Sequence, residues 1–296
     1  MKSSNIGGQA VMEGVMIRNA DKYAVAVRKT DGEIVVKTEE YKGIVQNKKI
    51  RSLPIIRGVF SFIDSMVLGM STLTYSASFF MDEEEEEKDE KKESVMMGLT
   101  IACSVVMAVA IFMILPYFLS QLFRKFTDST TLITLLEGAV RLVIFFGYIL
   151  LISRMKDIQR VFMYHGAEHK CINCIEHGME LNVENVLKSS RLHKRCGTSF
   201  LFIVMIVSII FFLFIRIESP IWRVVFRLLL IPVIAGVSFE FIRLAGKSEN
   251  KLVILLSKPG MMLQKLTTRE PDASMAEVAI ASVEAVFDWR AYLKEN

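Results

Sequence analysis

The chain has 296 residues, of which 52% are apolar, and its formal charge at pH 7 is +4. A mean hydropathy of +0.39 is high for a soluble globular protein and indicates a membrane protein. The small positive charge, without a basic stripe that carries interleaved aromatic residues, argues against nucleic-acid binding.

Residues 1–57 are predicted to form a cytoplasmic segment that contains a β-hairpin. Alternating apolar residues between positions 23 and 38 flank Asp31-Gly32, a favoured tight turn. The preceding stretch 7–14, Gly-Gly-Gln-Ala-Val-Met-Glu-Gly, is too rich in glycine for a helix, and we interpret it as a tight turn that lets the backbone pack closely. Glu13 is the one ionisable group in that stretch and is therefore a candidate catalytic residue.

Four segments within residues 94–245 have the length and composition of membrane spans. Residues 94–123 contain no charge over thirty positions, and residues 198–215 contain none over eighteen. The segment 129–153 carries Glu137 and Arg141 one helical turn apart, so that an internal ion pair lowers the cost of burying them. The segment 220–242 is the fourth span.

The distribution of Lys and Arg decides whether a fifth apolar segment, residues 58–80, crosses the membrane. Residues 1–57 carry eleven Lys or Arg, and residues 154–195 carry eight, so the positive-inside rule places both in the cytoplasm. Because two spans already separate them, 58–80 is predicted to be a surface or re-entrant helix. The tail 246–296 then returns to the cytoplasm. The predicted fold is a mainly α, multi-pass plasma-membrane protein with four transmembrane helices, both termini cytoplasmic, and a cytoplasmic loop at 154–197.

Two further segments have a recognisable character. Residues 81–93 are mostly acidic and are predicted to be a solvated linker, since like charges repel and bury little area. The tail is predicted to contain one helix from Asp272, a capping residue, to about Lys294. Apolar residues recur on one side of that helix at Val278, Ala281, Ala285, Trp289 and Tyr292.

The side chains with the strongest metal-binding chemistry are concentrated in one short region. All four histidines and three of the four cysteines lie between positions 165 and 196. Residues 165–169 form the pattern His-x-x-Glu-His, which places His165, Glu168 and His169 on one face of a helix. Two imidazoles can hold a zinc ion there while Glu168 takes a proton from bound water, as in the zincin type of site.

A catalytic zinc needs a third protein ligand, and four residues compete for that role. We rank them Glu240, Cys196, Glu13 and His193. Glu240 comes first because a lone carboxylate at the inner end of a span is costly without a partner. Cys196 and His193 precede the third span and return to the same membrane face as His165.

The pair Cys171-x-x-Cys174 has metal or redox spacing, but its role stays open. On a continuing helix Cys171, Cys174 and His177 point about 120° to 240° away from His165. A second metal site and plain packing are both compatible with that placement, whereas a thioredoxin-like role lacks its βαβ context.

Four motifs in order resemble the bacterial YqhQ-like family of integral membrane proteins, a family often labelled as predicted metal-dependent enzymes. They are GGQAVMEG at 7–14, YHGAEHK at 164–170, RCGTS at 195–199 and LTTREP at 266–271. The resemblance implies a bacterial membrane protein and carries over as candidate site positions Glu13, His165, Glu168, His169 and Cys196.

The leading hypothesis is a metal-dependent hydrolase that acts at the cytoplasmic membrane face on a membrane-associated substrate. In it His165 and His169 bind a divalent metal, zinc by preference, Glu240 or Cys196 completes the site, and Glu168 is the general base. The alternative is a non-enzymatic scaffold or assembly factor with a structural metal site. A transporter is a third reading, and it requires an oligomer to form a pathway.

Overall fold

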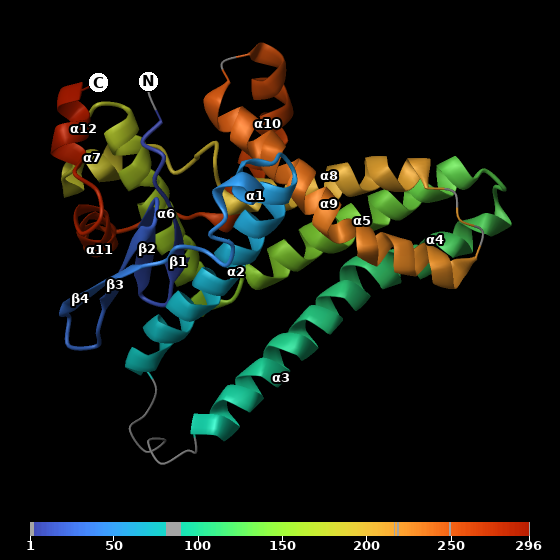
Figure 1. Cartoon of the computed structure of the whole chain (residues 1–296), viewed down its shortest axis with the longest axis horizontal. Helices are drawn as coiled ribbons and strands as arrows, with labels where there is room; N and C mark the ends of the chain where they lie inside the picture. The colour runs from blue at the N-terminus through green and yellow to red at the C-terminus, as the bar shows by residue number, and fades with distance from the viewer. Residues whose placement is uncertain (1–2, 81–89, 216, 218, 249, 296) are drawn as a thin grey trace. The chain divides into compact units, whose positions relative to one another are not determined.

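The computed structural model describes residues 3–80, 90–215, 217, 219–248 and 250–295. The chain divides into two compact units (Figure 1). The first unit comprises residues 1–80, 152–204 and 235–296, and the second comprises residues 81–151 and 205–234. The predicted single membrane domain 94–245 is therefore shared between the two units, since the loop at 154–197 packs with both chain ends.

The first unit contains a four-stranded antiparallel sheet with strand order β1-β2-β3-β4. The strands are β1 (Gly7–Val11), β2 (Gly14–Asn19), β3 (Lys22–Arg28) and β4 (Ile34–Glu40). The pair β3–β4 confirms the predicted hairpin around Asp31-Gly32. The interpretation of residues 7–14 as a turn was wrong for its glycine half, because Gly7 and Gly8 pair in register with Arg18 and Ile17 as part of a strand.

Alternation along the strands gives the sheet two buried faces, which explains its high apolar content. Val15, Ile17 and Ala26 point toward α6 (Lys156–Glu176) and α11 (Ala273–Glu284) and join their core. Val11, Val25 and other residues of the opposite face surround Leu68 of α2 (Ile56–Ala77). The sheet is thus a middle layer between α2 on one side and α6 with α11 on the other.

The helix α2 follows the short α1 (Lys48–Ser52), and η1 (Ser78–Phe80) continues it. Every fourth residue from Asp64 to Ser76 on one side of α2 is buried, and all of them except Leu68 hydrogen-bond to the sheet or to the segment after it. Asp64 accepts hydrogen bonds from the Tyr41 hydroxyl at 3.1 Å and the Ile44 N–H at 2.8 Å. Thr72 Oγ1 accepts from Gln9 Nε2 at 2.9 Å. The opposite side of α2 is apolar and exposed, and it carries Ile63, Met66, Val67, Met70 and Leu73.

The tail forms two helices where one was predicted. Asp272 caps α11 as expected, with its side chain accepting from the Met275 N–H, but α11 ends at Glu284. The chain turns over residues 285–288, and Asp288 Oδ1 accepts from the Ala291 N–H in α12 (Trp289–Glu295). The break allows Trp289 to pack back into the core shared by α6 and α11, which one straight helix would prevent. The first unit also contains α7 (Val183–Lys188) and α10 (Lys251–Thr267), and sequence analysis did not predict α10.

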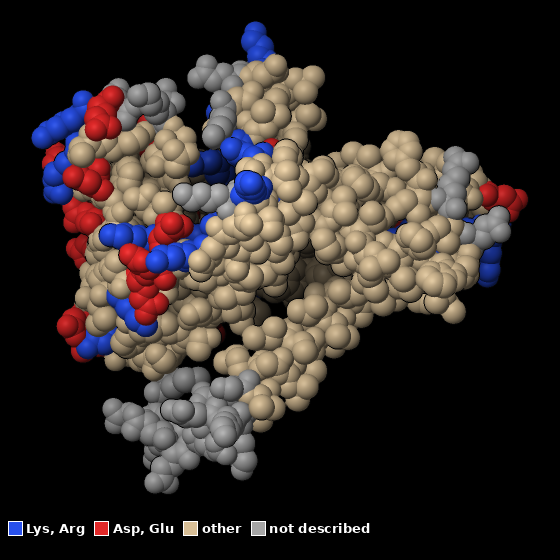
Figure 2. Space-filling view, viewed as in Figure 1, with Lys and Arg blue, Asp and Glu red and all other residues tan. Residues whose placement is uncertain are grey.

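In the described part of the chain, five helical segments are long and apolar enough to cross a membrane: Ile56–Phe80, Val95–Lys125, Thr130–Ile152, Gly197–Phe214 and Pro220–Gly246. They correspond to the four predicted spans together with the predicted surface or re-entrant helix. This composition supports a membrane protein. Where the second unit is visible in Figure 2, its helices are almost entirely uncharged along their length.

The second unit begins with α3 (Glu90–Val109), a wide π-helical turn η3 (Ala110–Ile114), α4 (Leu115–Gln121), η4 (Leu122–Lys125) and α5 (Thr130–Ile152). The wide turn precedes Pro116, whose ring and missing N–H disfavour a regular α turn. The helices α8 (Gly197–Phe214) and α9 (Pro220–Lys247) run through both units. Of the predicted acidic linker, residues 81–89 lie outside the described part of the chain, and residues 90–93 belong to α3.

The predicted intrahelical ion pair of α5 is confirmed, and it is part of a larger buried group. Arg141 Nη2 donates to Glu137 Oε1 at 3.0 Å, and Arg227 Nη1 donates to the same oxygen at 2.6 Å. Arg141 Nη1 also donates to Ser208 Oγ at 2.7 Å. Each charge therefore has a partner within the apolar bundle, as burial requires.

Leu68→Ala should lower the free energy of unfolding by about 2 to 5 kcal/mol, because the residue fills the core between α2 and the sheet. Leu73→Ala, on the exposed side of the same helix, is the matched control and should change stability by less than about 0.5 kcal/mol. Denaturant unfolding of the full chain in detergent measures both. Equal effects would contradict the packing of α2 against the sheet.

Candidate metal centre

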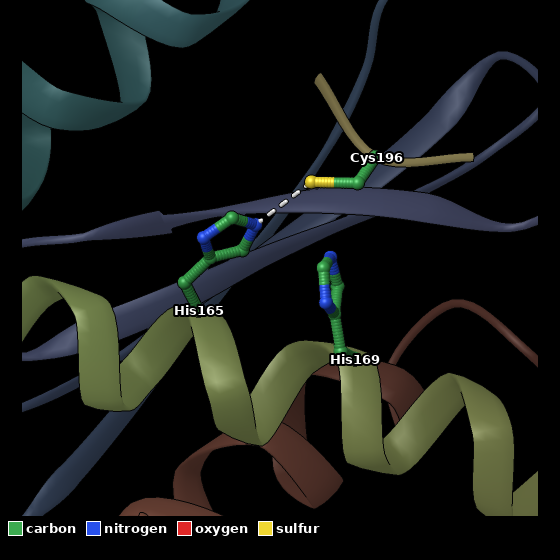
Figure 3. Close-up of side chains that lie close together, drawn as sticks. All are labelled: His165, His169 and Cys196. Carbon is green, nitrogen blue, oxygen red and sulfur yellow. Dashed lines mark hydrogen bonds between the residues drawn. The ribbon is translucent and has the colours of Figure 1, made fainter. Parts of the chain in front are cut away.

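Two histidines of α6 lie side by side one helical turn apart. The ring centroids of His165 and His169 are 4.4 Å apart, and Figure 3 shows both rings projecting from the same side of the helix. The helix holds this geometry because its other sides are anchored in the core through Tyr164, Ala167 and Cys171. The predicted shared face of the His-x-x-Glu-His pattern is confirmed for the two imidazoles.

A backbone carbonyl fixes each ring. His165 Nδ1 lies 2.9 Å from the Thr267 carbonyl oxygen, and His169 Nδ1 lies 2.6 Å from the Arg191 carbonyl oxygen. A carbonyl only accepts, so each Nδ1 carries the hydrogen. In the neutral rings the lone pairs then lie on the two Nε2 atoms, which is the arrangement that metal-binding histidines use.

Cys196 supplies a third donor at the same place. Its Sγ lies 3.3 Å from His165 Nε2, and ligand atoms of His165, His169 and Cys196 all lie within 4.8 Å of one another (Figure 3). Bond lengths of about 2.0 Å to nitrogen and 2.3 Å to sulfur place tetrahedral zinc ligands about 3.5 Å apart. The three residues therefore need only a small contraction to surround one ion.

The electrostatics of the trio favour a charged sulfur. Burial would raise the pKa of the Cys196 thiol, but the charge of His165 and hydrogen bonds from both histidines hold it well below its usual value. Burial likewise disfavours the imidazolium of His165, yet the Cys196 sulfur outweighs it and raises the pKa of His165 to about 9. The Thr198 N–H, at the start of α8, also donates to the sulfur at 3.4 Å. Both pKa shifts favour a thiolate at Cys196 beside a protonated His165.

Glu168 is buried on the same helix between the two histidines. Burial raises the pKa of its carboxyl, and the neighbouring His169 and His165 oppose that shift. Its Oε2 is a buried atom without a hydrogen-bond partner among the described residues. The Cβ that Gly8 lacks would lie 3.3 Å from the Glu168 carboxyl carbon, so glycine in β1 lets the strand pass close to this side chain. The carboxyl thus retains an acceptor for a further donor such as water.

Two residues that sequence reasoning missed hold the loop that leads to Cys196. Lys170 Nζ donates to the carbonyls of Leu187 at 2.7 Å and Ser189 at 2.8 Å. Asn173 Nδ2 donates to the carbonyls of Ser190 at 2.6 Å and Leu192 at 3.0 Å. Both side chains are buried. The sequence did contain a signal for both residues, because they follow His169 by one and four positions on the same helix.

Gln264 of α10 is a third residue that the sequence did not reveal. It is fully buried, its Nε2 donates to the His193 carbonyl and to Ser199 Oγ, both at 2.7 Å, and its Oε1 accepts from the His193 N–H at 2.9 Å. These bonds fasten the chain on both sides of Cys196. The sequence offered no signal for this, because α10 itself was not predicted.

Glu13 lies near α6 but is not one of the three grouped donors. Its carboxylate pairs with Arg160 and accepts from the Tyr164 hydroxyl at 3.2 Å. Its backbone is left-handed, with φ of 48°, in the turn between β1 and β2. The structure thus joins this turn to the first half of α6 and uses the Glu13 carboxylate for that contact.

Glu240, ranked first as third ligand, lies elsewhere. Arg57 Nε donates to its Oε1 at 2.6 Å, so the carboxylate has the partner that a charge in a span requires. Arg57 was not considered in the sequence ranking, which is why Glu240 looked unpaired. His193 is buried beside His169, with ring centroids 5.7 Å apart, but its Nε2 faces Glu176 at 3.6 Å. The geometry therefore brings Cys196, the second in rank, to the histidine pair.

The Cys171-x-x-Cys174 pair is packed inside the core. Both thiols are fully buried among apolar residues, and Cys174 Sγ contacts the Glu180 carbonyl at 3.4 Å. His177 Nδ1 lies 2.6 Å from the Asn173 carbonyl. The sequence left a second metal site and plain packing open for these residues. Packing fits the contacts, and no metal-ligand group among the described residues includes them.

Comparison of the sequence with known proteins shows the family to which the chain belongs. The profile of the protein family of unknown function DUF1385 matches residues 53–289, a range that contains the whole trio. The uncharacterized protein YqhQ of Bacillus subtilis (strain 168) is 36% identical over 301 residues, which cover 98% of this chain and 94% of that protein. No solved structure matches the chain.

Gly166→Ala should destabilise the site region by about 1 to 3 kcal/mol, because the added Cβ would lie 2.0 Å from the Arg269 carbonyl oxygen. The tail segment that anchors His165 would have to move. Gly147→Ala is the control, since nothing lies within 4 Å of its Cβ position. Thermal unfolding in detergent should show a lowered midpoint for the first variant only, and an unchanged midpoint for Gly166→Ala would contradict this contact.

Proposed function

This chain belongs to the DUF1385 family, and we propose that it is a metal-dependent enzyme of the membrane. The proposed activity is that of a hydrolase that uses one zinc-type ion. His165 Nε2, His169 Nε2 and Cys196 Sγ bind the ion. The observation that carries the proposal is the convergence of these three atoms, each on a side chain held by a further hydrogen bond. Imidazole and thiolate are the ligands that zinc prefers.

The number of donors favours catalysis over a purely structural ion. Structural zinc sites take four protein ligands, whereas catalytic sites take three and leave a position for water or substrate. Among the described residues only three donors form such a group. A zinc-type ion held by these residues would supply Lewis-acid chemistry and would lower the pKa of a water molecule at the open position to near 7.

Glu168 is the proposed general base. It lies on the same helix as both histidines, and its Oε2 has no other hydrogen-bond partner in the described structure. Burial raises the pKa of this carboxyl above its usual value, which makes the carboxylate a stronger base. The side chain can therefore hold a water molecule beside the ion and accept its proton. For Glu13 we propose a positioning role in the first half of the helix, which its contacts with Arg160 and Tyr164 support.

The alternative function is a scaffold or assembly factor in which the ion only fastens parts of the chain together. The specific observation in its favour is that the three donors and their carbonyl partners come from α6, the loop ending at Cys196 and the end of α10. An ion there would join these three segments even without chemistry.

Metal analysis tests the site. The purified full chain should contain about one zinc per chain, and His165→Ala should lose most of it because two donors bind far more weakly than three. His177→Ala is the matched control: His177 is the C-cap of the same helix, its Nδ1 contacts the Asn173 carbonyl, and the variant should keep the metal. A wild-type protein without stoichiometric metal after growth and dialysis with zinc would refute the proposal.

Glu168→Gln separates the enzyme from the scaffold. The amide should keep the metal and the fold but lose hydrolysis of ester, phosphate or peptide probes by a factor of about 100 or more, because it cannot accept a proton. Unchanged hydrolysis in a metal-loaded variant would contradict the role of Glu168, and a wild type without hydrolysis of any probe class would favour the scaffold.

The proposed topology has four spans, with the metal centre and both termini in the cytoplasm. The contacts of α2 support leaving it out of the spans. Its buried side bonds to a sheet whose edge strand β4 carries exposed Lys37, Glu39 and Glu40, and such an edge is not tolerated in hydrocarbon. Its other side is apolar, as expected of a helix that lies along the membrane surface.

Reporter enzymes fused to the N-terminus and to the C-terminus should both be active in the cytoplasm of a bacterial host. A reporter inserted at Asp128, between the second and third described candidate spans, should be active on the opposite side. Termini on opposite sides of the membrane would mean an odd number of spans and would overturn the exclusion of α2.

A further inference from the structure

One face of the helix α10 is buried against the rest of the protein. Ser257, Gly260, Leu263, Gln264 and Thr267 are buried on it. Gln264 bonds the chain around Cys196, and the Thr267 carbonyl accepts from His165. The position of α10 is therefore fixed by the same contacts that build the candidate metal centre.

The side of α10 next to this buried face is exposed and apolar. Leu252, Leu255 and Met262 are each more than 60% exposed, and Leu256 is 49% exposed. At about 100° per residue these side chains fall within about 120° of one another and form an exposed apolar stripe beside the buried face. A stripe of this kind is unfavourable in water and calls for an apolar environment.

A row of basic residues runs beside that stripe. Lys251, Lys258 and Lys265 are all exposed and recur every seven residues, which keeps them within about 40° of one another on the helix. The helix contains no acidic residue. Its outer side is thus an apolar stripe edged by positive charge, the pattern of helices that lie in a membrane interface.

The place of α10 in the chain identifies what covers this side. The candidate span in α9 extends to Gly246, and α10 begins at Lys251. The start of α10 is therefore only a few residues from the end of that span. With 17 residues and three lysines, α10 is not itself among the candidate spans. A helix so close to a span and so patterned meets the lipid headgroup region directly.

We infer that α10 docks on the bilayer surface and binds anionic phospholipid headgroups, with its leucines and Met262 in the acyl boundary and its three lysines on the phosphates. This inference goes beyond the proposed function and does not depend on bound metal. Since the inner face of α10 holds His165 and the chain around Cys196, docking places that region at the lipid surface.

Lipid binding tests the lysine row. Lys251→Gln, Lys258→Gln and Lys265→Gln combined should weaken the stabilisation of the full chain by phosphatidylglycerol in mixed micelles by about tenfold in lipid concentration, because each lysine contributes an attraction to anionic headgroups. The wild-type effect should shrink with added salt. Phosphatidylcholine should act equally on both proteins.

The matched control replaces three exposed lysines outside α10, Lys22, Lys42 and Lys294, by glutamine. It should respond to phosphatidylglycerol like the wild type. An equal loss in the control, or no loss in the α10 variant, would overturn the inference. Both variants should unfold like the wild type in lipid-free detergent, since the changed side chains are exposed.

Insertion depth tests the apolar stripe. In a Trp222→Phe background, Leu255→Trp in nanodiscs with brominated lipid should lose most of the added fluorescence, whereas Val36→Trp on the edge strand β4 should lose little. Absence of quenching at position 255 would overturn the inference. Absence of quenching together with a dimeric mass would assign the stripe to a second copy of the chain.

Discussion

The hydrogen bonds from the two imidazole Nδ1 atoms of α6 to the carbonyls of Thr267 and Arg191 are the constraint on which the candidate centre depends. They orient both rings and set which nitrogen is available to a ligand. They also tie α6 to two segments that are distant in sequence, the end of α10 and the loop before Cys196. The same two bonds thereby bring the thiol donor into place.

The loop around the candidate centre contains backbone carbonyls that need hydrogen-bond donors, and buried polar side chains supply them. Lys170, Asn173 and Gln264 are buried, which is unfavourable for polar groups unless each finds partners. Each of them donates to at least two acceptors, and most of these acceptors are carbonyls of an irregular loop that has no regular secondary structure to pair with. The loop is thus ordered by α6 and α10 rather than by its own sequence. Among the described residues Glu168 Oε2 is the exception in this region, and its free acceptor is the reason to propose a water molecule at this place.

Periodicity and local motifs in the sequence were enough to predict the elements that depend on local chemistry. The spacing of His165 and His169, the turn at Asp31-Gly32, the cap at Asp272 and the pair Glu137–Arg141 are all local, and all are present. Features that depend on distant partners were missed. Glu240 looked unpaired because Arg57 is far away in sequence, and Gly7 and Gly8 looked like a turn because their strand is fixed by pairing with β2 and by the approach of Glu168.

The helix α10 was missed for a different reason. Pro259-Gly260 is a strong local signal against a helix. Gly260 nevertheless suits this position, because Ser199 Cβ would lie only 3.0 Å from a Cβ there, and burial of the inner face outweighs the local preference. The tail helix was predicted as continuous because its apolar spacing continues through residues 285–288, where the chain in fact turns to bury Trp289.

The central claim is that one ion is bound by two imidazoles and one thiolate, and X-ray absorption at the zinc edge tests it most directly. The account predicts one sulfur at about 2.3 Å and nitrogen or oxygen neighbours at about 2.0 Å, with imidazole outer-shell scattering. Cys196→Ser should remove the sulfur contribution. Two sulfur neighbours in the wild type, which the Cys171-x-x-Cys174 pair would supply, or a sulfur signal that survives the substitution, would contradict it.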